Sequence, residues 1–168
     1  MIIRHIEPSD NRDIFDIYRQ TSVTEYTSQL PYLSSNKVAS LFEDESNYTL
    51  VVEVDECVVG HVTLFLTNKS RDKHCASIAI AVHPKVHGQG VGKALMKEAI
   101  NQADNWVNLV RLELEVHADN QAAIALYQSV GFDLEGTKRL STFKAGRYID
   151  MLLMSRINPD YLPMKLEQ

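Results

Sequence analysis

The segment Val82-His83-Pro84-Lys85-Val86-His87-Gly88-Gln89-Gly90-Val91-Gly92-Lys93 decides the fold, because it joins a strand to a helix through a loop with three alternating glycines. The preceding run at residues 76–82, ASIAIAV, is almost wholly apolar, which is typical of a central strand covered on both faces. Helical periodicity follows from Gly90 to Ala103. Glycines allow close backbone approach, and free N–H groups at a helix start attract anions. The segment therefore predicts a backbone cradle for a pyrophosphate, with added charge from Lys93.

Two familiar nucleotide-binding loops do not fit this segment. A Walker A loop needs Gly at position 87 and Ser or Thr at position 94, where the chain has His87 and Ala94. The dinucleotide fingerprint GxGxxG meets Lys93 or Leu95 where its third small residue belongs. A strand-to-helix turn whose glycines serve only steric needs remains the alternative.

Working outward from the loop, the sequence predicts one α+β domain over residues 1–168 with a mixed sheet. Strands are expected at residues 2–6, 48–54, 58–67, 76–82, 110–116, 132–139 and 147–155. Helices are expected after Pro8 and at residues 37–43, 90–103 and 121–130, and residues 21–35 are expected to be irregular. Turns are expected at Asp55-Glu56 and Ala145-Gly146, and Gly131 is expected to end a helix.

Composition restricts the function classes. The chain has 17 Lys and Arg against 22 Asp and Glu, a net charge of −5, which argues against a nucleic-acid partner. Cys57 and Cys75 show no zinc-like spacing, so we expect two buried free thiols in a reducing compartment. The N-terminus lacks the apolar core of a signal peptide, and no apolar run is long enough for a membrane span. These features predict a soluble cytoplasmic protein.

A second motif lies about thirty residues beyond the glycine loop. It reads Asn120-Gln121-Ala122-Ala123-Ile124-Ala125-Leu126-Tyr127-Gln128-Ser129-Val130-Gly131-Phe132. Taken alone, Asn120 is an N-cap and Tyr127 a core aromatic. Together, however, the two motifs resemble the GNAT superfamily of N-acetyltransferases. Its acyl-CoA signature Arg/Gln-x-x-Gly-x-Gly/Ala matches at both glycines and departs at His87, and its second motif Asn-x-x-Ala-x-x-Leu-Tyr-x-x-x-Gly-Phe matches at every fixed position.

The resemblance implies a central, mostly antiparallel sheet of about seven strands flanked by about four helices, and acetyl-CoA as the cofactor. It also implies a set of cofactor-binding residues. These are Ala81, Val82, His87, Gly88, Gln89, Gly90, Val91, Gly92, Lys93, Asn120 and Tyr127. The end of the strand at residues 81–82 would pair with the pantetheine arm, and the backbone N–H of Val82 would face the thioester carbonyl.

By the same resemblance, Tyr127 would protonate the leaving sulfur, with positioning alone as the alternative role. Many relatives carry a carboxylate in the central strand, where this chain has Ser77. Glu113 is the first candidate for a general base, because it lies on the opposite face from Leu112 and Leu114 and so toward the cleft; a solvated strand face is the alternative explanation. His83 and His74 are further candidates, and deprotonation into solvent is the last alternative.

The implied acceptor is the primary amine of a small molecule. The stretches Asp104-Asn105-Trp106, Arg111 to Leu114, Glu135-Gly136 and Gly146 to Asp150, with Met154, resemble the bacterial subgroup that acetylates free amino acids or related small amines. Expected substrate-binding residues are Gln29, Tyr32, Tyr148 and Asp150, and Tyr26 is expected to line the same pocket; ordinary packing and surface polarity are the alternative. The alternatives are a protein N-terminal or lysine acetyltransferase, a polyamine acetyltransferase, and an acyl-CoA sensor without catalysis. The superfamily also suggests a homodimer.

Overall fold

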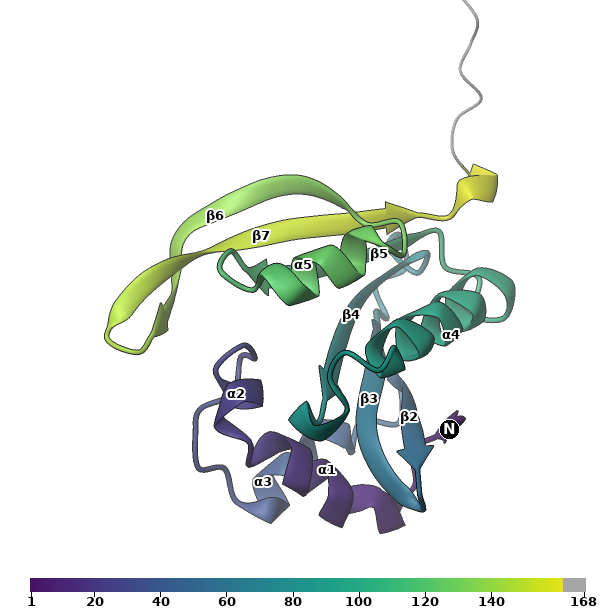
Figure 1. Ribbon diagram of the computed structural model, residues 1–168. Helices are drawn as coiled ribbons and strands as arrows, with labels where there is room; N and C mark the ends of the chain where they lie inside the picture. Colours follow the sequence, from purple (N-terminus) through teal and green to yellow (C-terminus); the bar gives the residue numbers. More distant parts are fainter. Residues whose placement is uncertain (162–168) are drawn as a thin grey trace, which may run out of the picture.

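The computed structural model describes residues 1–161, so the last seven residues of the expected domain lie outside the described part. It contains one sheet in the order β1-β2-β3-β4-β5-β7-β6, flanked by helices (Figure 1). The strands are β1 Ile2–His5, β2 Tyr48–Val54, β3 Cys57–Leu66, β4 Cys75–Val82, β5 Arg111–His117, β6 Asp133–Lys144 and β7 Arg147–Ile157. The α-helices are α1 Asn11–Tyr18, α2 Thr21–Thr24, α3 Ser35–Ala39, α4 Val91–Asn105 and α5 Gln121–Gln128. Short 3-10 turns are Pro8–Asp10, Ser40–Phe42, Pro84–Val86 and Pro159–Tyr161.

The sheet opens in its middle. Every neighbouring pair is antiparallel except β4 and β5, which are parallel. Those two strands pair only from Cys75 with Arg111 to Ser77 with Glu113. Beyond this point β4 stays paired with β3 up to Val82, and β5 stays paired with β7. The carboxyl-terminal halves of β4 and β5 therefore diverge and leave a gap between them.

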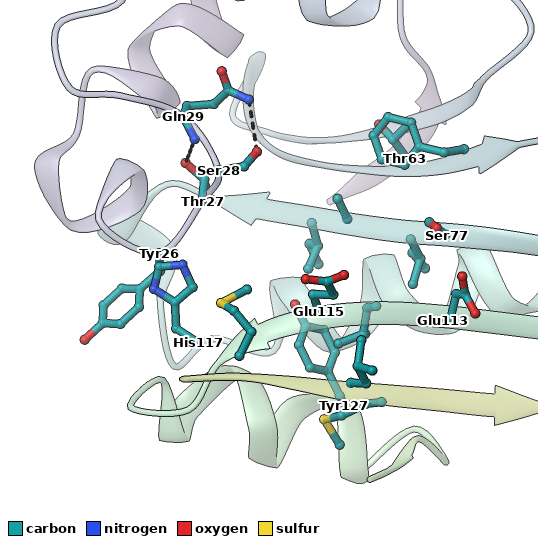
Figure 2. Close-up of a pocket in the computed structure, with 18 of the residues that line it drawn as sticks. Tyr26, Thr27, Ser28, Gln29, Thr63, Ser77, Glu113, Glu115, His117 and Tyr127 are labelled. Atoms are coloured by element: carbon teal, nitrogen blue, oxygen red, sulfur yellow. Dashed lines mark hydrogen bonds between the residues drawn. The ribbon is translucent and has the colours of Figure 1, made fainter. Parts of the chain in front are cut away.

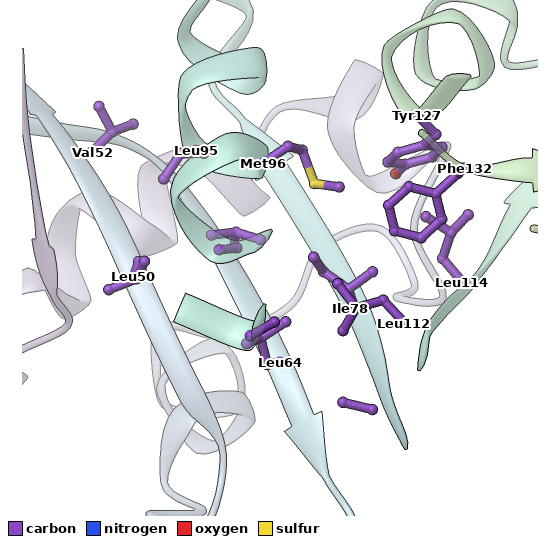
Figure 3. Close-up of a cluster of buried hydrophobic side chains, with 14 of the residues drawn as sticks. Leu50, Val52, Leu64, Ile78, Leu95, Met96, Leu112, Leu114, Tyr127 and Phe132 are labelled. Atoms are coloured by element: carbon purple, nitrogen blue, oxygen red, sulfur yellow. The ribbon is translucent and has the colours of Figure 1, made fainter. Parts of the chain in front are cut away.

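The main core lies under α4 and α5. Buried residues on α4 recur as Val91, Leu95, Met96, Ala99 and Ala103, a spacing that turns one stripe of the helix toward the sheet. They pack with the inward residues of β2 to β5 (Figure 3). The cluster drawn there includes Leu50, Val52, Leu64, Ile78, Leu112, Leu114, Tyr127 and Phe132.

A second cluster covers the opposite face of β2 and β3. Ile14, Ile17 and Tyr18 on α1 pack there with residues of the sheet and of α3. Two polar contacts fix α1 in place. The Asp13 carboxylate accepts from the backbone N–H of Val58 at 2.8 Å. Just before the helix, the Asp10 carboxylate accepts from two guanidinium nitrogens of Arg4 on β1, each at 2.8 Å.

Two expectations from the sequence were wrong. β4 is covered on both faces only near its end: Ser77 and Ala79, on the face away from α4, are exposed, and on that face only Ala81 is buried, in the cluster under α1. Cys57 is exposed rather than buried, since it follows the tight turn of the β2–β3 hairpin. Both cysteines are free, as expected.

Several other expectations are confirmed, including the mixed, mostly antiparallel sheet of seven strands. The two turns Asp55-Glu56 and Ala145-Gly146 have positive φ at both residues, the backbone of a two-residue hairpin turn. By contrast, residues 21–35, which were expected to be irregular, contain the short helix α2. Within residues 1–161, no helix is both long and apolar enough to cross a membrane.

Candidate active site

The loop between β4 and α4 presents open backbone. Gly88 and Gly90 have φ of 75° and 80°, and no atom lies within 4 Å of the position that a Cβ would take at either. Gly90 directly precedes α4. The N–H groups of the first helical turn, Val91 to Lys93, have no acceptor within the helix. This arrangement can hold an anion with main-chain donors.

His87 and Gln89 turn back onto the loop itself. The Nε2 atom of His87 donates to the carbonyl oxygen of Val82 at 2.9 Å, which ties the loop to the end of β4. The amide of Gln89 donates to the carbonyl of Lys85 at 3.1 Å. Gln89 is also the one expected cofactor-binding residue that does not line the cavity beside this loop, which is described next.

That cavity, which we call the loop cavity, has a volume of about 670 Å³ and lies between the glycine loop and the start of α5. Ten of the expected cofactor-binding residues line it. They are Ala81, Val82, His87, Gly88, Gly90, Val91, Gly92, Lys93, Asn120 and Tyr127. Asn120 also caps α5, because its Oδ1 accepts from the backbone N–H of Ala123 at 3.2 Å.

The edge of β4 is available along this cavity. The backbone N–H of His83 donates to the carbonyl of Val59 on β3 at 2.8 Å. Because backbone groups alternate along a strand, the N–H of Val82 and that of Ile80 point away from β3, toward the gap. β5 does not pair with β4 at this level. An extended chain can therefore bind there as a strand would.

A second cavity of about 790 Å³, the sheet cavity, lies over the opposite face of the sheet (Figure 2). Alternate residues of three strands form its floor: His61, Thr63 and Phe65 on β3, Ser77 and Ala79 on β4, and Glu113, Glu115 and His117 on β5. Its walls come from residues 26–29 after α2, from Tyr18 and Phe42, and from Met151 and Leu153 on β7.

The two cavities meet at the gap. Tyr26, Thr27, Ile80, Glu115 and Tyr127 line both of them. Tyr127 comes from α5, is 8% exposed and packs against the ring of the buried Phe132. Burial raises the pKa of Tyr127 to about 12, so its hydroxyl keeps its proton at neutral pH. A proton donor therefore lies where the two cavities join.

An ion-pair cluster lies at the closed end of the sheet cavity. Arg111 donates to both oxygens of Glu135, at 2.7 and 2.6 Å, and its Nε donates to Glu113 at 3.1 Å. The hydrogen bonds from Arg111 are the main cause that lowers the pKa of Glu135 to about 2. Glu113 is thus bound by Arg111 at the level where β4 and β5 still pair.

Two buried histidines line the sheet cavity and were missed from the sequence. Among the described residues, His61 and His117 are the two with a buried side-chain nitrogen that has no hydrogen-bond partner. In both rings this nitrogen is Nδ1. The other nitrogen of His61 lies 3.1 Å from the Tyr18 hydroxyl. Burial lowers the pKa of His61 to about 4, and burial followed by the charge of Lys144 lowers that of His117. Both rings are neutral at pH 7.

The structure brings only part of the expected substrate set to the cavity. Gln29 lines it, but Tyr32, Tyr148 and Asp150 line neither cavity. Tyr32 is fully exposed, and Tyr148 packs on Phe143 near the tip of the hairpin. Asp150 instead accepts from the backbone N–H of Leu140 across the hairpin at 2.8 Å. The β6–β7 hairpin is longer than expected, and Tyr148 and Asp150 lie in its outer part, away from the floor of the sheet.

The other candidate bases also lie elsewhere. His83 and His74 line neither cavity. The Nε2 atom of His83 lies 3.3 Å from the Asp16 carboxylate on α1. Glu115, which was not among the expected bases, lines both cavities. The signal that could have found it was its place on the same face of the strand as Glu113.

Comparison with known proteins agrees with this geometry. Residues 11–132 match the Acetyltransferase (GNAT) family. The chain belongs to this family. The predicted resemblance, the GNAT fold and the acetyltransferase activity class are thereby confirmed.

Relatives of this GNAT protein act on several acceptors. The L-amino acid N-acetyltransferase AaaT of Escherichia coli K12 is 35% identical over 158 residues, covering 94% of this chain and 98% of that protein. A spermidine N-acetyltransferase from Vibrio cholerae, solved with CoA and spermine, has a TM-score of 0.82 at 26% identity, covering 93% of this chain and 94% of that one. A ribosomal-protein-alanine N-acetyltransferase from Brucella melitensis has a TM-score of 0.83 at 26% identity, covering 94% of this chain and 100% of that one.

Proposed function

We propose that this GNAT protein transfers an acetyl group from acetyl-CoA to the primary amine of a free L-amino acid. The observation that carries the proposal is the junction of the two cavities at Tyr127. One cavity has the open glycine loop, and the other reaches the junction from the opposite face of the sheet. An acetyl donor bound in one cavity and an amine bound in the other can therefore react at the junction while each stays in its own cavity.

The residues of the loop cavity suit the parts of acetyl-CoA. The open N–H groups at the start of α4, with Lys93, offer donors and charge for its pyrophosphate. The free edge of β4 offers the N–H groups of Ile80 and Val82 to the carbonyl groups of its pantetheine arm, while the C=O of Val82 accepts from His87. When bound, acetyl-CoA supplies the activated acetyl group. Tyr127 then holds the proton that its hydroxyl can give to the leaving sulfur.

The choice of a free amino acid rests on the relative AaaT, which shares 35% identity over nearly the full length of both chains. A polyamine is the second candidate, and a specific feature favours it. Three glutamates, Glu113, Glu115 and Glu135, line the sheet cavity against one arginine, Arg111. Such a lining attracts an acceptor with more than one positive charge.

The experiment is acetyl-CoA-dependent thiol release with a panel of free amino acids, polyamines and short peptides. The exposed Cys57 makes a protein-only blank necessary. We expect turnover with one class of small amine. Tyr127→Phe should lower kcat by about 100-fold, because the departing sulfur loses its proton donor. Tyr161→Phe, which removes the hydroxyl of an exposed tyrosine, is the matched control and should keep the full rate.

The panel also tests the alternatives. Turnover restricted to peptides would replace the small-molecule acceptor with a protein N-terminus or lysine. Acetyl-CoA binding without turnover on any amine would favour a sensor. An unchanged kcat in Tyr127→Phe would remove the role of Tyr127 as proton donor while leaving the transferase intact.

A further inference from the structure

The sheet cavity contains two buried polar side chains that the proposed reaction does not use. His61 on β3 is 2% exposed and His117 on β5 is 4% exposed, and both line this cavity. Within the described residues, the buried Nδ1 atom of each ring has no hydrogen-bond partner. A buried polar group without a partner costs stability, so native proteins keep one mainly where a ligand, an ion or a water molecule completes it. Two such groups in one cavity indicate a binding site.

The two histidines lie at one level of the sheet, on either side of the gap. His61 pairs with Ala81 on β4. On the other side of β4, Ser77 pairs with Glu113, and four residues beyond this pair are Ala81 on β4 and His117 on β5. Because side chains alternate along a strand, all of these residues point to the face that bears the sheet cavity. Between the two imidazoles, β4 therefore contributes only the methyl group of Ala81.

The contact of His61 with Tyr18 shows which ring nitrogen holds the proton. Its Nε2 atom lies 3.1 Å from the Tyr18 hydroxyl. A neutral imidazole has one N–H and one acceptor nitrogen. If the Tyr18 hydroxyl donates to Nε2, the ring proton is on Nδ1, and only this N–H lacks a partner. The opposite arrangement would leave both the phenol proton and Nδ1 without partners. Nδ1 of His61 is therefore a buried donor that lacks an acceptor.

His117 offers a second donor at the same level. The centre of its ring lies 5.8 Å from that of Tyr26, and Figure 2 shows the two side chains next to each other at the end of β5. Lys144 lies over the same Tyr26 ring, but it forms an ion pair with Asp119, so the two charges cancel. A neutral imidazole can hold its proton on either nitrogen. His117 can thus turn an N–H toward an acceptor atom between the two rings.

The closed end of the cavity has the opposite character. Among the described residues that line the cavity, Arg111 is the one with a permanent positive charge. Its guanidinium already donates to Glu113 and Glu135, which leaves one net negative charge at this end. That end attracts an ammonium group and repels a carboxylate. An acceptor that carries both groups is therefore oriented with its carboxylate toward the histidines.

We propose that His61 and His117 bind the α-carboxylate of the acceptor amino acid through their ring N–H groups, an inference that rests on the proposed function and gives it a basis for selecting amino acids. Each carboxylate oxygen accepts from one imidazole. The α-amine is attached to the carbon next to the carboxylate, so this contact also directs the amine to the nearby junction. An amine without a carboxylate leaves both N–H groups unpartnered, and a site built in this way discriminates strongly against it.

The central test compares the best amino acid of the panel with the amine that lacks only its carboxylate. Wild type should prefer the amino acid by about 100-fold or more in kcat/KM, because two hydrogen bonds to a charged group are at stake. His61→Leu and His117→Leu should each reduce this preference by about tenfold or more, since each removes one of the two bonds. The kcat/KM for the amine without a carboxylate should change little. General damage to the enzyme would instead lower both rates together and leave their ratio unchanged.

His74→Leu is the matched control, because it makes the same change at an exposed histidine that lines neither cavity. It should keep the preference of wild type. Calorimetric titration with acetyl-CoA should give the same Kd for all three variants as for wild type, which excludes misfolding.

A second measurement needs no turnover. In ¹H–¹⁵N NMR of the enzyme with CoA in place of acetyl-CoA, no acetyl group is present to be transferred. His61 should show its N–H at Nδ1 before any amine is added, and His61→Leu identifies this signal by its loss. The amino acid should shift the signal, whereas the amine without a carboxylate should leave it in place.

Several results would overturn the proposal. A preference within about twofold of wild type in either variant would refute the role of that histidine. An equal shift of the Nδ1 signal with both ligands, or a proton found on Nε2, would refute carboxylate binding at His61. All of these leave the transferase in place. Turnover by wild type only with amines that have no carboxylate next to the amine would refute the proposed function and this inference with it.

Discussion

At the scale of single residues, Gly90 connects backbone geometry to ligand binding. Its φ of 80° costs an L-residue about 1–2 kcal/mol, and a methyl group there would stand in the open space of the loop cavity. We expect Gly90→Ala to lower the free energy of unfolding by about 1 kcal/mol. It should also weaken acetyl-CoA binding by about tenfold or more. Urea unfolding and calorimetric titration measure the two effects.

Gly146 is the matched control for this prediction. It has a φ of 81°, and a Cβ there would also meet nothing within 4 Å, but it lies in the turn between β6 and β7. Gly146→Ala should lose similar stability and keep its affinity for acetyl-CoA. Equal losses of affinity in both variants would mean that the effect of Gly90 is general destabilisation.

Individual site residues were predictable where a backbone motif fixes them. The glycines of the loop and Asn120 occupy positions that the local chain dictates, and Tyr127 lies in the helix that Asn120 caps. Glu115 was not selected, because a charged residue on an alternating strand is equally typical of a solvated face. Only the divergence of β4 from β5, a long-range feature, reveals that this face lines a cavity.

At the scale of elements, hydrophobic periodicity predicted the presence and type of nearly every strand and long helix. The alternation of Leu112, Leu114 and Val116 against charged residues identified β5. The apolar run of β4 predicted the wrong burial for this strand, because the alanine at residue 79 is small enough to face either a cavity or a core. The length of β6 and β7 was underestimated, since strand ends in a hairpin depend on cross-strand pairing.

The connection between β1 and α1 gives a prediction at this scale. Arg4 lowers the pKa of the buried Asp10 through two hydrogen bonds. Because the folded-state pKa is lowered, the stabilisation is fully present above about pH 4, the ordinary pKa of aspartate, and is lost as the pH falls through the folded-state value. Asp10→Asn should therefore cost about 1–3 kcal/mol at pH 7 and less in strong acid, measured by urea unfolding.

Asp133→Asn provides the comparison, because Asp133 is exposed at the start of β6. Its stability should follow that of wild type at every pH. If the cost of Asp10→Asn were the same in acid as at pH 7, the loss would come from packing rather than from the charged pair.

At the scale of the whole molecule, the sheet cavity could not be derived from the sequence. Its floor joins residues of β3, β4 and β5, and its wall includes Tyr26. The end of the β6–β7 hairpin reaches this wall, where Lys144 lies 4.1 Å from the centre of the Tyr26 ring and pairs with Asp119. Segments more than a hundred residues apart thus meet, and local periodicity carries no information about such contacts.

The buried His61 makes the stability of the fold depend on pH. Its folded-state pKa of about 4 lies below the ordinary value of about 6.5, so between these values the unfolded chain binds the extra proton. Stability should therefore fall as the pH drops from 6.5 to 4, by up to about 3 kcal/mol. His61→Gln, which still offers Tyr18 a partner but does not titrate, should flatten this part of the curve.

The exposed His74 provides the surface control for the same substitution. His74→Gln should reproduce the wild-type curve of urea stability against pH. If the stability of His61→Gln fell as steeply as that of wild type between pH 6.5 and 4, the loss of stability would come from other groups. His117 would be the first of these.

The divergence of β4 and β5 leaves β4 with a free edge inside the molecule. Edge strands are usually the sites where foreign chains add and aggregation begins, and proteins protect them with charges, bulges or short lengths. Here the free edge at Ile80 and Val82 lies within a cleft rather than on the rim of the sheet. A hazard in most β-proteins thus becomes a slot that admits one slender extended molecule and excludes a second sheet.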